Sequence, residues 1–232
     1  MPVIVFVSPK GGVGKSTSAV VLAGELSREV PVTVIDADPN KPIKRWADSA
    51  NPSNITVDSA ADESNILDHI EDAAATTPFV IVDLEGSAAK IVIWAISQAD
   101  LVIIPVQGSE LDAAQASQAL NAIRQQEKVS RRKIPHTVLL TRTSAIIRTR
   151  GMAHIQNSMK EAGIPVLQTE LNEREAFKAI FSFNRKLSEL DPVEVSNVDK
   201  AVANAQAYTN EIIALLRTHK DAESVPLTSE AS

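Results

Sequence analysis

Residues 10–17 read Lys-Gly-Gly-Val-Gly-Lys-Ser-Thr, and this glycine-rich loop constrains the fold more than any other stretch of the chain. The apolar run before it, residues 3–7, predicts a buried strand, and the run after it, residues 19–23, predicts a helix. In a strand–loop–helix of this kind, backbone N–H groups and the helix N-terminus surround a polyphosphate. We therefore expect a phosphate-binding loop in which Lys15 contacts the β- and γ-phosphates and the Ser16 hydroxyl holds Mg²⁺.

The loop departs from the general pattern G-x-x-x-x-G-K-[ST] at its beginning. Pro9 stands where the first glycine would fall, and a second lysine, Lys10, follows it. In these residues the chain resembles the deviant Walker A family, the ParA- and MinD-type ATPases, whose loop reads K-G-G-x-G-K-[ST]-T. The resemblance implies that Lys10 reaches across a nucleotide-sandwiched homodimer to the partner's phosphates and takes part in catalysis with Lys15; the alternative is a solvated loop lysine. It also implies that ATP is bound by Lys10, Gly11, Gly12, Val13, Gly14, Lys15, Ser16 and Thr17.

Apolar strand-like runs alternate with helical patterns along the 232 residues, which predicts an α/β fold. We expect one P-loop NTPase domain over residues 1–218, with a mostly parallel twisted sheet flanked by helices on both faces. Residues 219–232 are polar and lack periodicity, so a disordered tail is expected there. The predicted strands are residues 3–7, 32–35, 55–57, 79–82, 101–105 and 137–140. The predicted helices are residues 16–29, 43–50, 62–74, 87–98, 111–127, 148–162 and 197–217.

The composition excludes several functions. The chain has no cysteine, which excludes disulfides, Cys-ligated zinc and iron–sulfur clusters, and therefore the nitrogenase-reductase and cluster-carrier branches of the family. No apolar run is long enough to cross a bilayer, and the first residues do not form a signal peptide, so a cytoplasmic location is expected. The net charge of −6 does not favour DNA binding, so any DNA surface must be a local basic patch.

Acidic residues follow two of the predicted strands. The strand at residues 32–35 runs into Asp36-Ala37-Asp38-Pro39, and the strand at residues 79–82 ends in Asp83. Ligands bind beyond the carboxyl ends of strands in open α/β sheets, so these carboxylates are candidates for the site. The family resemblance implies that Asp36 and Asp83 lie in the Mg²⁺ shell and that Asp38 is the catalytic carboxylate that orients the attacking water.

Three further segments resemble the family. Residues 83–90 correspond to switch II, where Gly86 would supply a γ-phosphate-sensing N–H, although the variant Glu85 departs from the usual turn. Arg142 lies at the position that borders the nucleotide base, where it either stacks on adenine or forms a surface ion pair. Residues 36–46 look especially like small ParA-type ATPases of bacterial plasmids, including those that assist conjugative transfer, and Trp46 is expected to pack the switch I helix onto the sheet.

The resemblance implies an ATPase that binds Mg²⁺ and ATP, dimerises, binds DNA without sequence preference on the nucleoid, and releases it on slow hydrolysis stimulated by a small ParB-type or centromere-binding adaptor. Such a protein segregates or positions a cargo. The alternatives are a MinD-like membrane-associated ATPase, disfavoured because the last helix carries few cations, and a ligase of the dethiobiotin synthetase type. A second basic cluster, Arg131-Arg132-Lys133, is also a candidate for DNA contact. The principal DNA-contact candidates are Arg148, Arg150, Lys178, Arg185 and Lys186.

Overall fold

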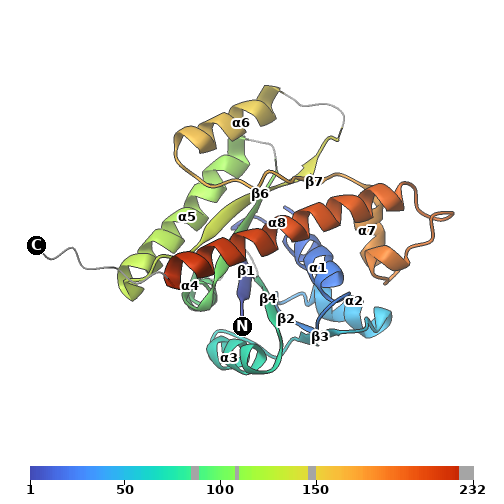
Figure 1. Cartoon of the computed structure of the whole chain (residues 1–232), viewed down its shortest axis with the longest axis horizontal. Helices are drawn as coiled ribbons and strands as arrows, with labels where there is room; N and C mark the ends of the chain where they lie inside the picture. The colour runs from blue at the N-terminus through green and yellow to red at the C-terminus, as the bar shows by residue number, and fades with distance from the viewer. Residues whose placement is uncertain (85–88, 108–109, 146–149, 225–232) are drawn as a thin grey trace, which may run out of the picture.

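The computed structural model describes residues 1–84, 89–107, 110–145 and 150–224. Their strands form one seven-stranded sheet in the order β3-β2-β4-β1-β5-β6-β7, and every neighbouring pair is parallel (Figure 1). The expected α/β P-loop architecture is confirmed. The strands are β1 (Val3–Phe6), β2 (Val32–Ala37), β3 (Ile55–Asp58), β4 (Phe79–Leu84), β5 (Leu101–Val106), β6 (His136–Thr143) and β7 (Leu171–Asn172).

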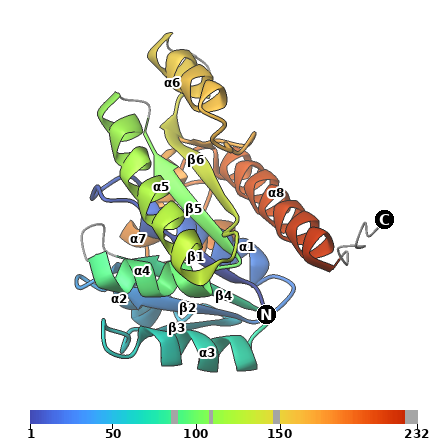
Figure 2. The same cartoon turned by 90° about the vertical axis from the view of Figure 1, so that its left-hand side faces the viewer.

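Helices cover both faces of the sheet, and each face has its own hydrophobic core. In Figure 2, α5 and α8 lie on opposite sides of β5 and β6. The helices of one face are α3 (Ile66–Thr76), α4 (Ala89–Gln98), α5 (Glu110–Ser130) and α6 (Arg150–Glu161). Those of the other face are α1 (Lys15–Leu26), α2 (Pro42–Ala50), α7 (Glu175–Ser182) and α8 (Val198–Ser224), with a short 3₁₀ turn, η1 (Leu187–Glu189).

The strands are continuously apolar because both of their faces are buried. In β1, Val3 and Val5 belong to one core, whereas Ile4 and Phe6 belong to the other, and all four side chains are at most 4% exposed. Among the described helices, none is both long and apolar enough to cross a membrane.

The structure differs from the sequence prediction mainly near the carboxyl end. β7, α7 and η1 were not predicted, because each is too short to show a clear periodicity. The last helix was expected to end near residue 217, but it continues to Ser224, so the tail expected to be disordered from residue 219 begins as helix. Residues 220–223 are Lys-Asp-Ala-Glu, and a helix that is already formed extends through such residues without needing an apolar face.

One helix start also differs from the prediction. A helix was expected from residue 62, but α3 begins at Ile66. The Asp62 carboxylate accepts hydrogen bonds from the backbone N–H of Ser64 at 2.7 Å and from the Ser64 hydroxyl at 2.6 Å. This local turn competes with helix formation and delays the start of the helix.

Strand order places the site. β1 lies between β4 and β5, and β2 lies next to β4, so the carboxyl ends of β1, β2 and β4 are neighbours at one edge of the sheet. The chain leaves β1 toward one side of the sheet and later returns to its other side, which makes this edge a topological switch point of the kind where α/β proteins bind ligands.

Candidate nucleotide-binding site

The loop between β1 and α1 has the backbone conformation that its glycines allow. Gly12 and Gly14 have φ angles of 77° and 98°, in the left-handed region that residues with a side chain rarely adopt. Gly14 is the N-cap of α1, and its carbonyl accepts the first helical hydrogen bond from Ser18 N–H at 2.8 Å. The backbone N–H groups at the start of α1 therefore lie at the loop, where they can donate hydrogen bonds to an anion.

Two side chains from distant strands hold the loop in place. Thr141, in β6, donates its hydroxyl to the Val13 carbonyl at 2.7 Å, and this contact is buried. Gln107, just beyond β5, donates its side-chain amide to the Gly12 carbonyl at 3.0 Å. Because these carbonyls are already engaged from outside the loop, the loop is fixed by the sheet rather than by its own sequence alone.

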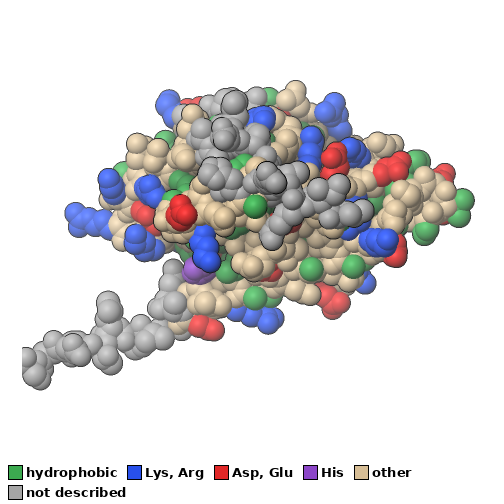
Figure 3. Space-filling model, turned by 90° about the horizontal axis from the view of Figure 1, so that it is seen from above, with side chains coloured by type: hydrophobic (Ala, Val, Ile, Leu, Met, Phe, Trp, Pro, Cys, Tyr) green, Lys and Arg blue, Asp and Glu red, His purple; other side chains and the backbone are tan. Residues whose placement is uncertain are grey.

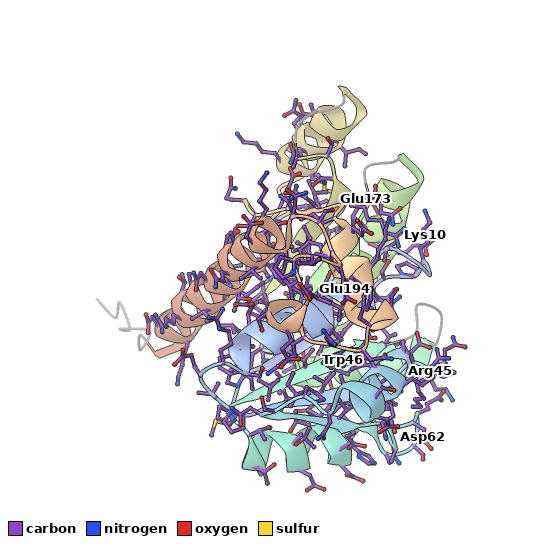
Figure 4. The ribbon with its side chains drawn as sticks, turned by 90° about the vertical axis from the view of Figure 1, so that its right-hand side faces the viewer. Lys10, Arg45, Trp46, Asp62, Glu173 and Glu194 are labelled. Atoms are coloured by element: carbon purple, nitrogen blue, oxygen red, sulfur yellow. The ribbon has the colours of Figure 1, made fainter. Side chains whose placement is uncertain are left out.

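The loop walls a pocket of about 350 Å³. Lys15 is only 7% exposed, and its ammonium donates to the Lys10 carbonyl at 3.3 Å. Lys10 lies at the outer edge of the molecule, on the same side as Arg45 (Figure 4). The pocket is lined by Pro9, Gly11, Gly12, Gly14, Lys15, Ser16, Thr17, Asp38, Asn40 and Arg142.

Two buried carboxylates lie behind the pocket. Asp36 and Asp83 are paired across β2 and β4 in the sheet register, and both are 0% exposed. One oxygen of Asp36 accepts the Lys44 backbone N–H at 2.8 Å. The other oxygen of Asp36 and both oxygens of Asp83 have no hydrogen-bond partner among the described residues. Such atoms are costly to bury unless a ligand completes their coordination.

Burial raises the pKa of both groups. Desolvation raises the pKa of Asp83 to about 7; the Ser16 hydroxyl and the Lys15 ammonium lower it in part, and the charges of Asp36 and Asp38 raise it further. Desolvation also raises the pKa of Asp36, against the Lys44 N–H and the positive charge of Lys41. Carboxylates held at such a cost fit the magnesium site expected here, since Mg²⁺ is usually bound by one or two carboxylates together with phosphates and water.

Asp38 lies at the mouth of the pocket rather than behind it. Its carboxylate accepts the Asn40 backbone N–H at 2.8 Å, and its carbonyl accepts the Lys41 N–H at 2.8 Å. Lys41, with a φ of 46°, then turns its ammonium back to the Asp36 carbonyl at 2.9 Å. This tight turn fixes Asp38, which lines the same pocket as the phosphate loop.

The geometry agrees with the comparisons with known proteins. A family model described as VirC1 protein matches residues 1–219. The protein ParA of Rhizobium radiobacter is 42% identical over 214 residues, which cover 91% of this chain and 96% of the relative. The chain belongs to the VirC1 family of ParA-type ATPases. The protein virC1 of Rhizobium rhizogenes is 29% identical over 188 residues, covering 78% of this chain and 80% of the relative.

Solved structures agree at the level of the fold. Apo McdA from Cyanothece superposes with a TM-score of 0.73 at 20% identity, covering 89% of this chain and 99% of the other. The MinD cell division protein of Aquifex aeolicus gives a TM-score of 0.67 at 18% identity, covering 98% and 100%. These likenesses confirm the fold in which the pocket lies.

Arg142 lies beside the pocket in a backbone conformation unusual for its residue type. It has a φ of 52°, and its side chain is exposed. It lines both the phosphate pocket and a smaller neighbouring cleft formed with Asn172, Glu173 and Phe177. The pKa of Glu173 is lowered, first by the hydrogen bond and charge of Lys178 and then by the charge of Arg142. Both readings of Arg142, stacking on a base and pairing with an acid, fit this position.

The residues expected to contact DNA differ in their exposure and in their contacts with other side chains. Lys178 is exposed but forms an ion pair with Glu173 at 2.9 Å, and Arg185 is exposed. Lys186 is mostly covered: its side chain is 12% exposed and its ammonium contacts Ser53 at 2.9 Å and Glu189 at 3.2 Å. Arg148 and the switch II residues Glu85 and Gly86 lie outside the described residues, as does the side chain of Arg150.

Trp46 packs as expected and also makes a contact that the sequence did not predict. Its indole is 1% exposed within the core beneath α2, and its Nε1–H donates to the Arg185 carbonyl at 3.3 Å. The helix that follows Asp36 and Asp38 is thus joined to the segment that carries Arg185 and Lys186. The sequence analysis also missed Gln107 and Thr141, because nothing in their local sequence marks a contact with residues far along the chain. It missed Lys41 and Lys44 as well, because their contacts with Asp36 depend on the turn that follows β2.

The buried charge of Asp83 predicts an effect on stability. Since the folded-state pKa lies above the unfolded value, the penalty is fully present above about pH 7 and is relieved as the pH falls toward 4. Asp83→Asn should therefore stabilise the metal-free protein by on the order of 2 kcal/mol at pH 8, and by less at pH 5. Urea unfolding in EDTA at both pH values measures this difference. Asp48→Asn, at an exposed acid of α2, is the control, and an equal effect of both variants would contradict the assignment.

Proposed function

We propose that this protein is an ATP-dependent positioning ATPase that hydrolyses ATP to ADP and phosphate to move a DNA or protein cargo. The observation that carries the proposal is the convergence of a phosphate loop, Asp38 and the buried pair Asp36–Asp83 at one edge of the sheet. Similar proteins support it, since one relative is named for maintenance of carboxysome distribution and one solved structure of the same fold is that of a plasmid partition protein.

Each residue has a distinct part in hydrolysis. Lys15 and the backbone N–H groups of the loop bind the β- and γ-phosphates, and Ser16, Asp36 and Asp83 hold the metal ion directly or through water. The ion, when bound, neutralises charge that develops on the phosphate oxygens. Asp38, fixed by the Asn40 N–H, orients the attacking water and accepts its proton. Catalysis is then mainly positioning and charge stabilisation, as is usual for phosphoryl transfer.

The position of Lys10 at the molecular edge supports a dimer that shares the nucleotide site. Lys10 begins the phosphate loop at the molecular edge, so a second protomer that faced this edge would receive it at its own nucleotide (Figure 4). We propose that two ATP molecules are enclosed in this way, that the paired protomers bind DNA without sequence preference on the nucleoid, and that a small ParB-type or centromere-binding adaptor stimulates hydrolysis.

The DNA-binding part of the proposal predicts strong salt dependence. Because the net charge is −6, a single protomer should bind DNA weakly, and pairing doubles any local basic patch. Affinity for a random-sequence duplex should be at least about tenfold higher with ATP than with ADP, and should fall several-fold as salt doubles. Filter binding at two salt concentrations measures both effects.

Substitutions that remove single charges test which basic residues form the DNA-binding patch. Removing the charges of Arg148, Arg150, Lys178 and Arg185 should weaken DNA binding while ATP-driven dimerisation persists. Lys186→Ala should have a smaller effect, since that side chain is engaged with Ser53 and Glu189. Equal DNA affinity with ADP and ATP would contradict the proposal, and ATP-dependent pelleting with liposomes would instead favour the MinD-like alternative.

A further inference from the structure

A second cavity lies at the opposite end of the sheet from the nucleotide pocket. It has a volume of about 390 Å³ and lies between Pro2, Phe79 and Pro135 on one side and Ile213 and Leu216 of α8 on the other. We call this cavity the basal groove. Phe79 begins β4, Pro2 precedes β1 and Pro135 precedes β6, so the groove lies at the amino ends of the strands. The groove shares no lining residue with the nucleotide pocket.

The rim of the basal groove is cationic. Arg132, Arg217, His219 and Lys220 line it together with one acid, Asp100. On α8, Ile213, Leu216, Arg217 and Lys220 recur at the spacing that places residues on one helical face. Figure 3 shows Lys and Arg side chains gathered at the left-hand end of the molecule, and Figure 1 shows the carboxyl end of α8 at that side.

Two acids near the rim accept hydrogen bonds from backbone N–H groups and keep their negative charge, but the basic side chains that line the groove outnumber Asp100. Asp100 accepts the Val3 backbone N–H at 2.7 Å, and Glu127 accepts the Ile134 N–H at 3.0 Å. Arg132 is held in place by donating one guanidinium nitrogen to the carbonyls of Ser97 and Ala99, at 3.0 and 2.8 Å. The lining therefore has a net positive charge, with Arg132 in a fixed position, on a protein whose total charge is negative.

We propose that the basal groove is a docking site for an acidic peptide segment with apolar anchor residues, supplied by a partner protein. The apolar floor, formed by Phe79, Pro135 and Leu216, would bind an aliphatic or aromatic side chain. The basic rim would bind carboxylates next to that side chain. A DNA duplex supplies negative charge through its phosphates, but its backbone has no apolar group to insert into a cavity.

We further propose that this partner protein is the cargo adaptor, and this step rests on the proposed function. The placement suits such a role, because a segment bound at the amino ends of the strands leaves the opposite edge free for nucleotide and for a second protomer. A cargo held in the basal groove would remain attached while the nucleotide face opens and closes.

The test uses the full chain and a fluorescein-labelled peptide in which Glu and Asp alternate with Leu and Phe. Fluorescence anisotropy should show saturable binding that weakens with salt. Replacing Leu and Phe in the peptide by Ser should weaken binding at least about tenfold, and so should the double variant Arg217→Glu with Lys220→Glu. Lys200→Glu, an exposed position on the same helix, is the matched control and should leave the affinity unchanged.

Several results would overturn the docking site. These are failure of the wild-type chain to bind the peptide, equal binding by the Ser-substituted peptide, and equal binding by the double variant. Displacement of the peptide by duplex DNA, with loss of DNA binding in the double variant, would make the rim a DNA surface instead. If a chain shortened to end at Ser224 bound the peptide and the full chain did not, the occupant would be the chain's own terminus.

ATP-dependent DNA binding is measured on the same samples, so the two proposals fail separately. A double variant that loses the peptide and keeps ATP-dependent DNA binding supports the docking site and leaves the proposed function standing. Wild-type protein that binds the peptide but never DNA would retain the docking site and refute nucleoid binding.

Discussion

Lys15→Ala should lower the affinity for ATP on the order of 100-fold, because charge-assisted contacts to phosphate oxygens contribute about 3 kcal/mol at a site shielded from water. Lys15 as a whole is 7% exposed, and its ammonium lies at the phosphate loop. It donates to the Lys10 carbonyl at 3.3 Å, a contact within the loop, so its removal should leave the fold intact. Isothermal titration of ATP with Mg²⁺ measures the affinity, and circular dichroism checks the fold.

Lys10→Ala separates the two lysines of the loop. Lys10 begins the loop at the molecular edge, whereas Lys15 begins α1 at the pocket floor. Lys10→Ala should keep most of the ATP affinity while weakening dimerisation and hydrolysis. A Lys10→Ala protein that dimerised and hydrolysed ATP normally would refute the role in a shared site, and a Lys15→Ala protein that bound ATP normally would refute the phosphate-loop assignment.

Asp38→Ala should reduce ATP hydrolysis by about 10²–10³-fold, the usual contribution of a positioned general base. ATP should still bind, because Lys15, Ser16 and the buried carboxylates keep their places. The variant should therefore accumulate as an ATP-bound dimer, which gel filtration with light scattering detects. Phosphate release in single-turnover conditions measures the rate.

Two companion variants make this result specific. Asp38→Asn keeps an acceptor for the Asn40 N–H and so preserves the turn, but it removes the negative charge, and it should be nearly as slow as Asp38→Ala. Asp48→Ala removes an exposed acid of α2 and should be unaffected. Wild-type turnover in Asp38→Asn would show that the carboxylate is not the base.

Which residues gather at the candidate site was predictable from the sequence, because the signal lies in short segments. A glycine loop between an apolar strand and a helix has few uses besides phosphate binding, and a carboxylate just beyond a buried strand lies at the carboxyl edge of a parallel sheet. Residues 10–17, Asp36, Asp38 and Asp83 were found in this way, and the structure brings them to one edge. The parallel sheet with helices on both faces followed equally from the alternation of strand and helix patterns.

The tertiary structure decided what depends on residues far apart in sequence. Thr141 and Gln107 hold the phosphate loop, Trp46 reaches Arg185, and Lys186 is withdrawn from the surface by Ser53 and Glu189. The basal groove likewise joins the amino ends of three strands to the last turns of α8. A residue's local pattern determines its strand or helix, but burial, pKa and partners depend on the segments packed against it, which is why only the folded chain fixes them.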